Sequence, residues 1–132
     1  MSTTTVVAYT GNSAGNIRAS GSLAASGTSS ANLDYSAVFE AQIDVECTPG
    51  GTVAGTNGLK IEIFRRYGST PTTAATAMLT YTLPSVASTA ASLPPIYLGP
   101  GYYTIKWTNL DTANALTDVT ITGDTVTSLS TS

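Results

Sequence analysis

The feature that most constrains the fold is a long alternation of apolar and polar residues over residues 35–47, YSAVFEAQIDVEC. The odd-numbered positions from Tyr35 to Cys47 are apolar, and most of the even-numbered positions between them are polar. A period of two over this length is typical of a β-strand with one buried face. Other strands must cover that face, so the pattern predicts a sheet protein.

Further short strands are predicted at residues 59–67, 77–84, 101–107 and 115–124, separated by turns rich in Gly and Pro. Residues 92–98 form a weaker segment, because Pro94 and Pro95 cannot donate to a ladder and suit an edge strand. No segment has a convincing helical pattern. This spacing predicts an all-β, antiparallel β-sandwich of about seven strands. Its expected core residues are Phe39, Ile43, Val45, Ile61, Ile63, Tyr103, Ile105, Trp107, Val119 and Ile121.

Two strand orders are compatible with this pattern. In an immunoglobulin-like layout, strands 35–47 and 59–67 lie in opposite sheets. In a simple meander they pair, which could set Glu46 beside Lys60 and Glu40 beside Arg66.

Residues 1–33 differ in composition from the rest of the chain, because they contain a single charged residue, Arg18, among Ser, Thr, Ala, Gly and Asn. We expect them to form an extended N-terminal arm or edge segment, ordered on contact with a partner. Residues 34–132 are then the sandwich domain. The candidate interface residues are Val6, Val7, Tyr9, Ile17 and Arg18 of the arm, together with Arg66 and Tyr102.

Charge and composition exclude several classes of partner. The 132-residue chain has a net charge of −3 and five basic residues, so it lacks the basic stripe that neutralises nucleic-acid phosphates. It has no amphipathic helix and no apolar run long enough to cross a bilayer. The first 15 residues lack the basic and apolar regions of a secretory signal, so we expect none. The only cysteine, Cys47, can form no intrachain disulfide.

The residues that carry most enzyme chemistry are missing. The chain has no histidine, which removes the commonest general base and the commonest zinc ligand. Ser13 lies in GNSAG, which matches a Gly-x-Ser-x-Gly elbow but lacks its strand, helix and histidine context. Asp44 and Glu46 have a spacing open to a glycosidase pair, but an alternating acidic stripe is typical of a solvated strand face. We therefore expect no catalytic, metal or cofactor site.

The segment LPPIYLGPGYYTIKWTN, residues 93–109, resembles the penultimate strand of immunoglobulin-like sandwiches, including many from bacteria and phages. The resemblance extends loosely over residues 35–122. It implies that the hydroxyl of Tyr103 bonds back to the backbone at the corner. Tyr102 would then point outward, and Trp107 would be a core residue.

In overall style the chain resembles small phage virion proteins, which join a polar arm of low charge to such a sandwich. The resemblance implies a capsid decoration (cement) protein, located in the virion and assembled in the host cytoplasm. Its expected partners are the major capsid protein and further copies of itself, with a trimer as one possible oligomer. Two alternatives stay open. One is a sugar-binding or adhesive module, which should expose an aromatic cluster such as Tyr102 with Tyr97 or Tyr81. The other is a tail or baseplate component.

Overall fold

The computed structural model describes residues 5–6, 15–52, 57–67, 72–126 and 130–131. All of the regular structure in these residues is β-strand. The strands are β1 (Thr5–Val6), β2 (Gly15–Arg18), β3 (Thr28–Tyr35), β4 (Glu40–Pro49), β5 (Asn57–Tyr67), β6 (Thr72–Thr73), β7 (Leu79–Pro84), β8 (Ala91–Ser92), β9 (Ile96–Leu98), β10 (Gly101–Asn109), β11 (Leu116–Val126) and β12 (Ser130–Thr131).

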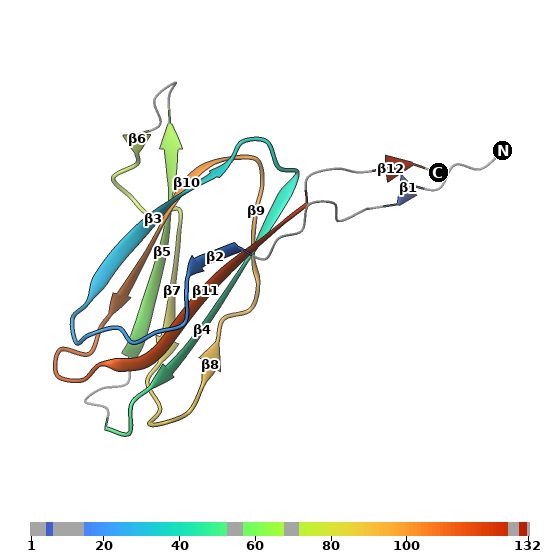
Figure 1. Cartoon of the computed structure of the whole chain (residues 1–132). Coiled ribbons are helices and arrows are strands. Elements are labelled where there is room, and N and C mark those ends of the chain that lie inside the picture. Colours follow the sequence, from blue (N-terminus) through green and yellow to red (C-terminus); the bar gives the residue numbers. More distant parts are fainter. Residues whose placement is uncertain (1–4, 7–14, 53–56, 68–71, 127–129, 132) are drawn as a thin grey trace.

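Two antiparallel sheets stack face to face (Figure 1). One has the order β3-β10-β5, with β6 and β7 both paired to β5. The other has the order β2-β11-β4, with β8 and β9 both paired to β4. The strand pairs are nested along the chain, from its ends toward its middle: β2 with β11, β3 with β10, β4 with β9, and β5 with β7. This nested pairing is that of one long hairpin rolled into two sheets, which is a jelly roll.

The predicted class, an all-β antiparallel sandwich, is confirmed, with more strands than the seven expected. Strands β4 and β5, which correspond to the predicted strands 35–47 and 59–67, lie in opposite sheets. This agrees with the immunoglobulin-like layout and not with the meander. The jelly-roll order refines this picture, because β10 pairs with β3 and β5 while β11 lies in the other sheet.

The core fills the space between the two sheets. Its fully buried side chains are mostly the inward-facing Ile, Leu and Val residues of β4, β5, β10 and β11, and Trp107 is 5% exposed. Of the ten predicted core residues, nine are buried: Ile43, Val45, Ile61, Ile63, Tyr103, Ile105, Trp107, Val119 and Ile121. Burial on this scale supplies the main stabilising free energy of the fold.

The prediction for Phe39 is wrong, because its side chain is 53% exposed. The alternation over residues 35–47 crosses a turn between two strands. The Asp34 carboxylate accepts hydrogen bonds from the amide and hydroxyl of Ser36, and the Val38 amide donates to the Tyr35 carbonyl. Asx-type bonding of this kind ends β3 at Tyr35. Phe39 therefore lies just before β4, beyond the end of the core.

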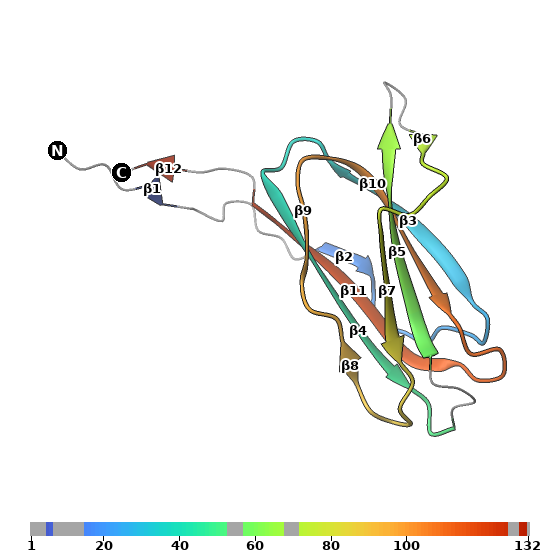
Figure 2. The same cartoon turned by 180° about the vertical axis from the view of Figure 1, so that it is seen from behind.

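Residues 15–33, which the composition assigns to an arm, belong to the sandwich. β2 pairs with β11 and β3 pairs with β10, while Leu23 is buried and bridges Leu116. The polar residues of β3 alternate with Ala31, Leu33 and Tyr35, so its polarity is that of a strand with one solvated face. Of the remaining arm, only Thr5 and Val6 are described, as β1 paired with β12; Figure 2 shows this pair apart from the two sheets.

The Tyr103 corner is confirmed. The Tyr103 hydroxyl donates to the Gly99 carbonyl at 2.9 Å, and its ring is buried beside that of Tyr35, with centroids 6.3 Å apart. Gly101, which lies between Gly99 and Tyr103 in the chain, has a φ of +148°, a region that favours glycine. The hydroxyl thus fixes the turn that leads into β10.

The described part of the chain contains no helix long and apolar enough to span a membrane.

Candidate functional site

The outward side of the sheet formed by β2, β11, β4, β8 and β9 is strongly acidic. Because alternate residues of a strand face the same side, the outward positions of β4 and β11 hold a group of carboxylates. This acidic face consists of Glu40, Asp44, Glu46, Asp118 and Asp124. It contains five of the eight acidic residues of the chain.

Hydrogen bonds hold one end of the acidic face in place. The Asp118 carboxylate accepts from the Ser20 hydroxyl at 2.7 Å and from the Gly21 amide at 2.8 Å. The Ser20 hydrogen bond is the main reason that the pKa of Asp118 lies below its ordinary value. Asp118 therefore stays ionised and ties residues 20–21 to β11.

Arg18 is the only basic residue on this sheet, and its guanidinium is bound to the backbone. It donates to the carbonyls of Ala19, Gly21, Ser22 and Val119. Such a clamp holds the loop after β2 against β11. The face therefore keeps a large excess of negative charge.

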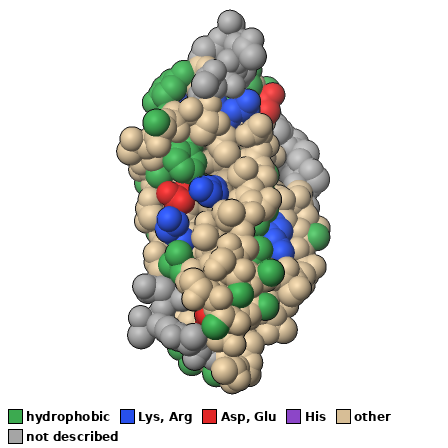
Figure 3. Space-filling view, turned by 90° about the vertical axis from the view of Figure 1, so that its left-hand side faces the viewer, with side chains coloured by type: hydrophobic (Ala, Val, Ile, Leu, Met, Phe, Trp, Pro, Cys, Tyr) green, Lys and Arg blue, Asp and Glu red, His purple; other side chains and the backbone are tan. Residues whose placement is uncertain are grey.

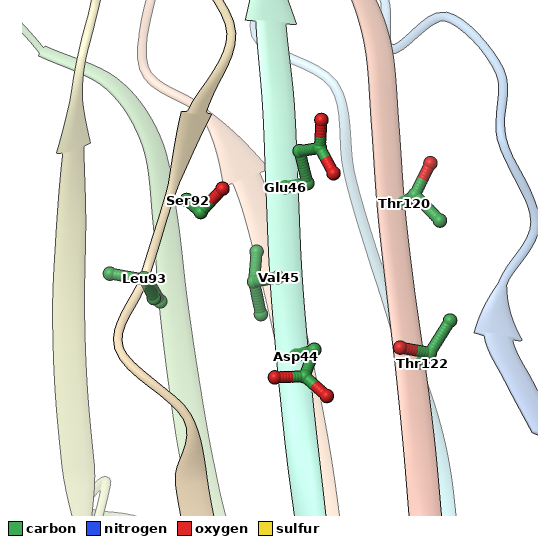
Figure 4. A pocket seen from close by; sticks show the side chains of 7 residues that line it. All are labelled: Asp44, Val45, Glu46, Ser92, Leu93, Thr120 and Thr122. Atoms are coloured by element: carbon green, nitrogen blue, oxygen red, sulfur yellow. The ribbon is translucent and has the colours of Figure 1, made fainter. Parts of the chain in front are cut away.

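A cavity of about 310 Å³ lies on the acidic face (Figure 4). Asp44 and Glu46 of β4 lie between Thr120 and Thr122 of β11 on one side and the β8 segment with Ser92 on the other. Asp44 and Glu46 are about 7 Å apart, given the rise of a strand. Hydroxyl and carboxylate groups line the cavity together with Val45 and Leu93, so it can accept and donate hydrogen bonds beside an apolar surface.

The outward side of the other sheet, formed by β3, β10, β5, β6 and β7, carries most of the basic residues. Lys60 and Arg66 of β5 and Lys106 of β10 face outward there, with Glu62 of β5 and Asp34 of β3. We call these five residues the basic face. Figure 3 views the side of the molecule on which β3 lies, where basic and acidic side chains gather on a surface of mostly uncharged groups.

One ion pair organises the middle of the basic face. Lys60 Nζ lies 3.3 Å from a Glu62 carboxylate oxygen, and Lys106 lies directly across from Glu62 in the register of β10 and β5. Two lysines thus lie next to one carboxylate, which leaves an excess of positive charge at this point. At one end of the same sheet, the Arg65 guanidinium lies 5.9 Å from the ring centroids of both Tyr67 and Tyr103.

The exposed aromatic cluster expected of a sugar-binding module is not formed by the three named tyrosines. Tyr102 faces outward on the basic-face sheet, and Tyr97 is 59% exposed on the edge of the other sheet. Tyr81 packs against the core. Tyr97 lies across from Gln42, whose amide donates to Asp44 at 3.1 Å, so one aromatic ring adjoins the acidic face.

The predicted interface residues are dispersed. Arg66 and Tyr102 are brought together, since they are paired in the register of β5 and β10. Ile17 packs partly buried against the core, and Arg18 is the backbone clamp described above. Val7 and Tyr9 lie outside the described residues, and for Val6 only its backbone pairing in β1 is described. Ser13 of the elbow-like motif also lies outside them.

Cys47 is a buried thiol of the core. Burial raises its pKa to about 11, with smaller contributions from Asp118 and Glu46. Among the described residues, no group of three or more His, Cys, Asp or Glu side chains is arranged to hold a metal ion.

The separation of charge between the two faces is the surface feature that the sequence analysis missed. The parity of residues 35–47 places Glu40, Asp44 and Glu46 on one face, and the parity of residues 116–124 exposes Asp118. Only the pairing of β4 with β11 shows that these two strands are neighbours. That pairing joins residues far apart in sequence, so no local pattern reports it.

No protein-family model and no curated protein matches the sequence. Similar solved structures include the cowpea mosaic virus top component, described as naturally occurring empty particles (TM-score 0.49, 5% identity, covering 88% of this chain and 88% of that chain). Another is infectious bursal disease virus Gx strain (TM-score 0.44, 17% identity, 96% of this chain and 33% of that chain). A third is Family 16 Carbohydrate Binding Module-2 (TM-score 0.42, 8% identity, 84% and 74%). These neighbours are β-sandwich-like viral capsid proteins and carbohydrate-binding modules, and likenesses of this size identify neither a family nor a function.

Proposed function

We propose that this chain is a non-enzymatic structural protein of a virus particle, of the phage capsid decoration type, which binds the major capsid protein and stabilises the shell. The observation that carries the proposal is that both sheets of the sandwich present broad outer faces of opposite charge. Such faces suit contact with an extended protein surface, where complementary charge directs encounter and orientation. The jelly-roll order adds support by analogy, since viral capsid domains use it, as do lectins.

The acidic face is the more distinctive of the two surfaces for this role. Its carboxylates are spread along β4 and β11 instead of converging on one point, so a partner would contact them over a length of strand. Specific protein interfaces need about 800 Å² from each partner, which a sheet face supplies and a small cavity does not.

The test uses particles of the virus that encodes this chain, prepared without it. Purified chain is added to these particles, which are then separated on a density gradient and heated while genome release is followed. We expect the chain to sediment with the particles and to raise the temperature of release, because binding stabilises the bound state. Folded chain that stays at the top of the gradient over all ratios tested would refute the proposal.

A second candidate function is carbohydrate binding, favoured by the exposed ring of Tyr97 beside Gln42 and Asp44. Sugar-binding sites combine an apolar or aromatic surface with a few fixed polar groups. A glycan array followed by calorimetry tests this function. Binding that is lost in Tyr97→Ala and kept in Tyr102→Ala would support it, and the absence of binding by the unaltered chain would exclude it for the glycans on the array.

A further inference from the structure

We propose that the acidic face of one copy of this chain binds the basic face of a second copy, head to tail. The contact is between copies of this chain and needs no capsid, so the inference goes beyond the proposed function. Its starting point is the charge distribution. The outer side of the sheet of β2, β11 and β4 carries five carboxylates against Arg18. The outer side of the other sheet carries three of the five basic residues against Glu62 and Asp34.

The spacing of the charges fits such a contact. On the acidic face, Asp44 and Glu46 are two residues apart on β4, which separates them by about 7 Å. On the basic face, Lys60 lies across from Thr108, and Lys106 is two residues from Thr108 on β10. Lys60 and Lys106 are therefore diagonal neighbours, about 7–8 Å apart. Two lysines on one copy match two carboxylates on the other at nearly equal spacing.

Exposure decides which charges of the basic face are offered to a partner. The Lys60 side chain is 34% exposed, whereas that of Glu62 is 18% exposed. Glu62 is thus the more covered member of the pair, and Lys60 is the more accessible charge. On the opposite sheet, Arg18 is held by four backbone carbonyls and does not neutralise Asp44 or Glu46.

The two contacting surfaces are different, so the interface is heterologous. A heterologous contact leaves one unused face at each end of a dimer, and repetition gives a closed ring or an open chain. Because the two faces lie on opposite sides of the sandwich, successive copies stack along one line, and we expect an open chain whose terminal acidic face stays available to another partner.

The experiment is sedimentation velocity on the full chain at about 0.01 M salt and at about 1 M salt, where the Debye length falls from about 30 Å to about 3 Å. We expect association at low salt and its loss at high salt. Two reversal variants are compared: Asp44→Lys/Glu46→Lys on the acidic face and Lys60→Glu/Lys106→Glu on the basic face. Each variant alone should sediment as a monomer at low salt. An equimolar mixture of the two should associate again, because each variant then meets the charge it lacks.

The control Ala75→Lys/Ala87→Lys adds positive charge at exposed positions outside both faces and should leave association intact. Circular dichroism checks that each variant is folded. If a reversal variant does not fold, the neutral pair Asp44→Asn/Glu46→Gln replaces it, again with loss of association expected. A wild-type chain that stays monomeric at low salt, or association that survives the reversals or fails to return in the mixture, would overturn the proposal.

Discussion

Tyr103→Phe removes a single hydroxyl from the corner before β10 and leaves the ring in place. That hydroxyl donates to the Gly99 carbonyl at 2.9 Å, and the ring keeps its buried position beside Tyr35. A hydrogen bond of this kind contributes about 0.5–1.5 kcal/mol net. Gly99 is exposed, so water can replace the lost donor and the full cost of a buried unpaired carbonyl does not apply. We therefore expect a loss of about 1 kcal/mol in the free energy of unfolding.

For a chain of this length the unfolding entropy scales with residue number, so about 1 kcal/mol corresponds to a fall in Tm of about 3–4 °C. The assay is urea and thermal unfolding, fitted to two states with an unchanged m-value. Tyr102→Phe is the matched control, because Tyr102 immediately precedes Tyr103 and faces the outside of the sheet. We expect it to stay within about 0.5 kcal/mol of the unaltered chain. Equal stability of the two variants would show that the corner hydrogen bond does not stabilise the fold.

Three further predictions concern the core. Trp107→Ala should cost about 3–5 kcal/mol in urea unfolding, because it leaves a cavity at a buried site. Phe39→Ala should cost less than about 0.5 kcal/mol, because the Phe39 side chain is exposed, and equal losses for the two variants would contradict the assigned burial. Gly123→Ala should cost about 1–3 kcal/mol, because the new methyl carbon would lie 2.7 Å from the Tyr35 hydroxyl, and thermal melting in a Tyr35→Phe background should show a smaller cost. Burial raises the pKa of Cys47 from 9.0 to about 11. As the pH rises, the unfolded chain loses the thiol proton before the folded chain does, so the free energy of unfolding should fall between pH 9.0 and about 11. The fall should be about 2–3 kcal/mol larger in the unaltered chain than in Cys47→Ala. Thiol labelling of the native chain at pH 8 should be slow.

The sequence predicts the sandwich and most of its core because alternation reports directly which side chains face inward. Ile61, Ile63 and Ile105 lie well inside the long strands β5 and β10, at alternate positions that face the core. Phe39 was predicted wrongly for a local reason. The Asp34 and Ser36 hydrogen bonds insert a turn without breaking the alternation of apolar letters, so two strands look like one. Asp34 followed two residues later by Ser36 was the available signal.

The placement of residues 15–33 could not be predicted from composition. β3 is an edge strand with one solvated face, and a polar edge strand has few apolar residues to distinguish it from an unstructured arm. A deletion that tests the arm should therefore end at residue 14, since removing residues 1–33 would also remove β2 and most of β3. The opposed charges of the two faces depend on β4 meeting β11, a pairing between distant parts of the chain.

The rolled pairing of the strands has a consequence for synthesis. β10 lies between β3 and β5, and β11 lies between β2 and β4, although these are the last two strands of the sandwich to be made. Until both have left the ribosome, β2 and β3 have no partner and the long strands β4 and β5 each have an open edge. Pairings between distant segments form slowly, and exposed strand edges invite aggregation meanwhile. A message truncated before β10 should therefore yield only insoluble product, and a chaperone that shields β4 and β5 should raise the yield of the complete chain.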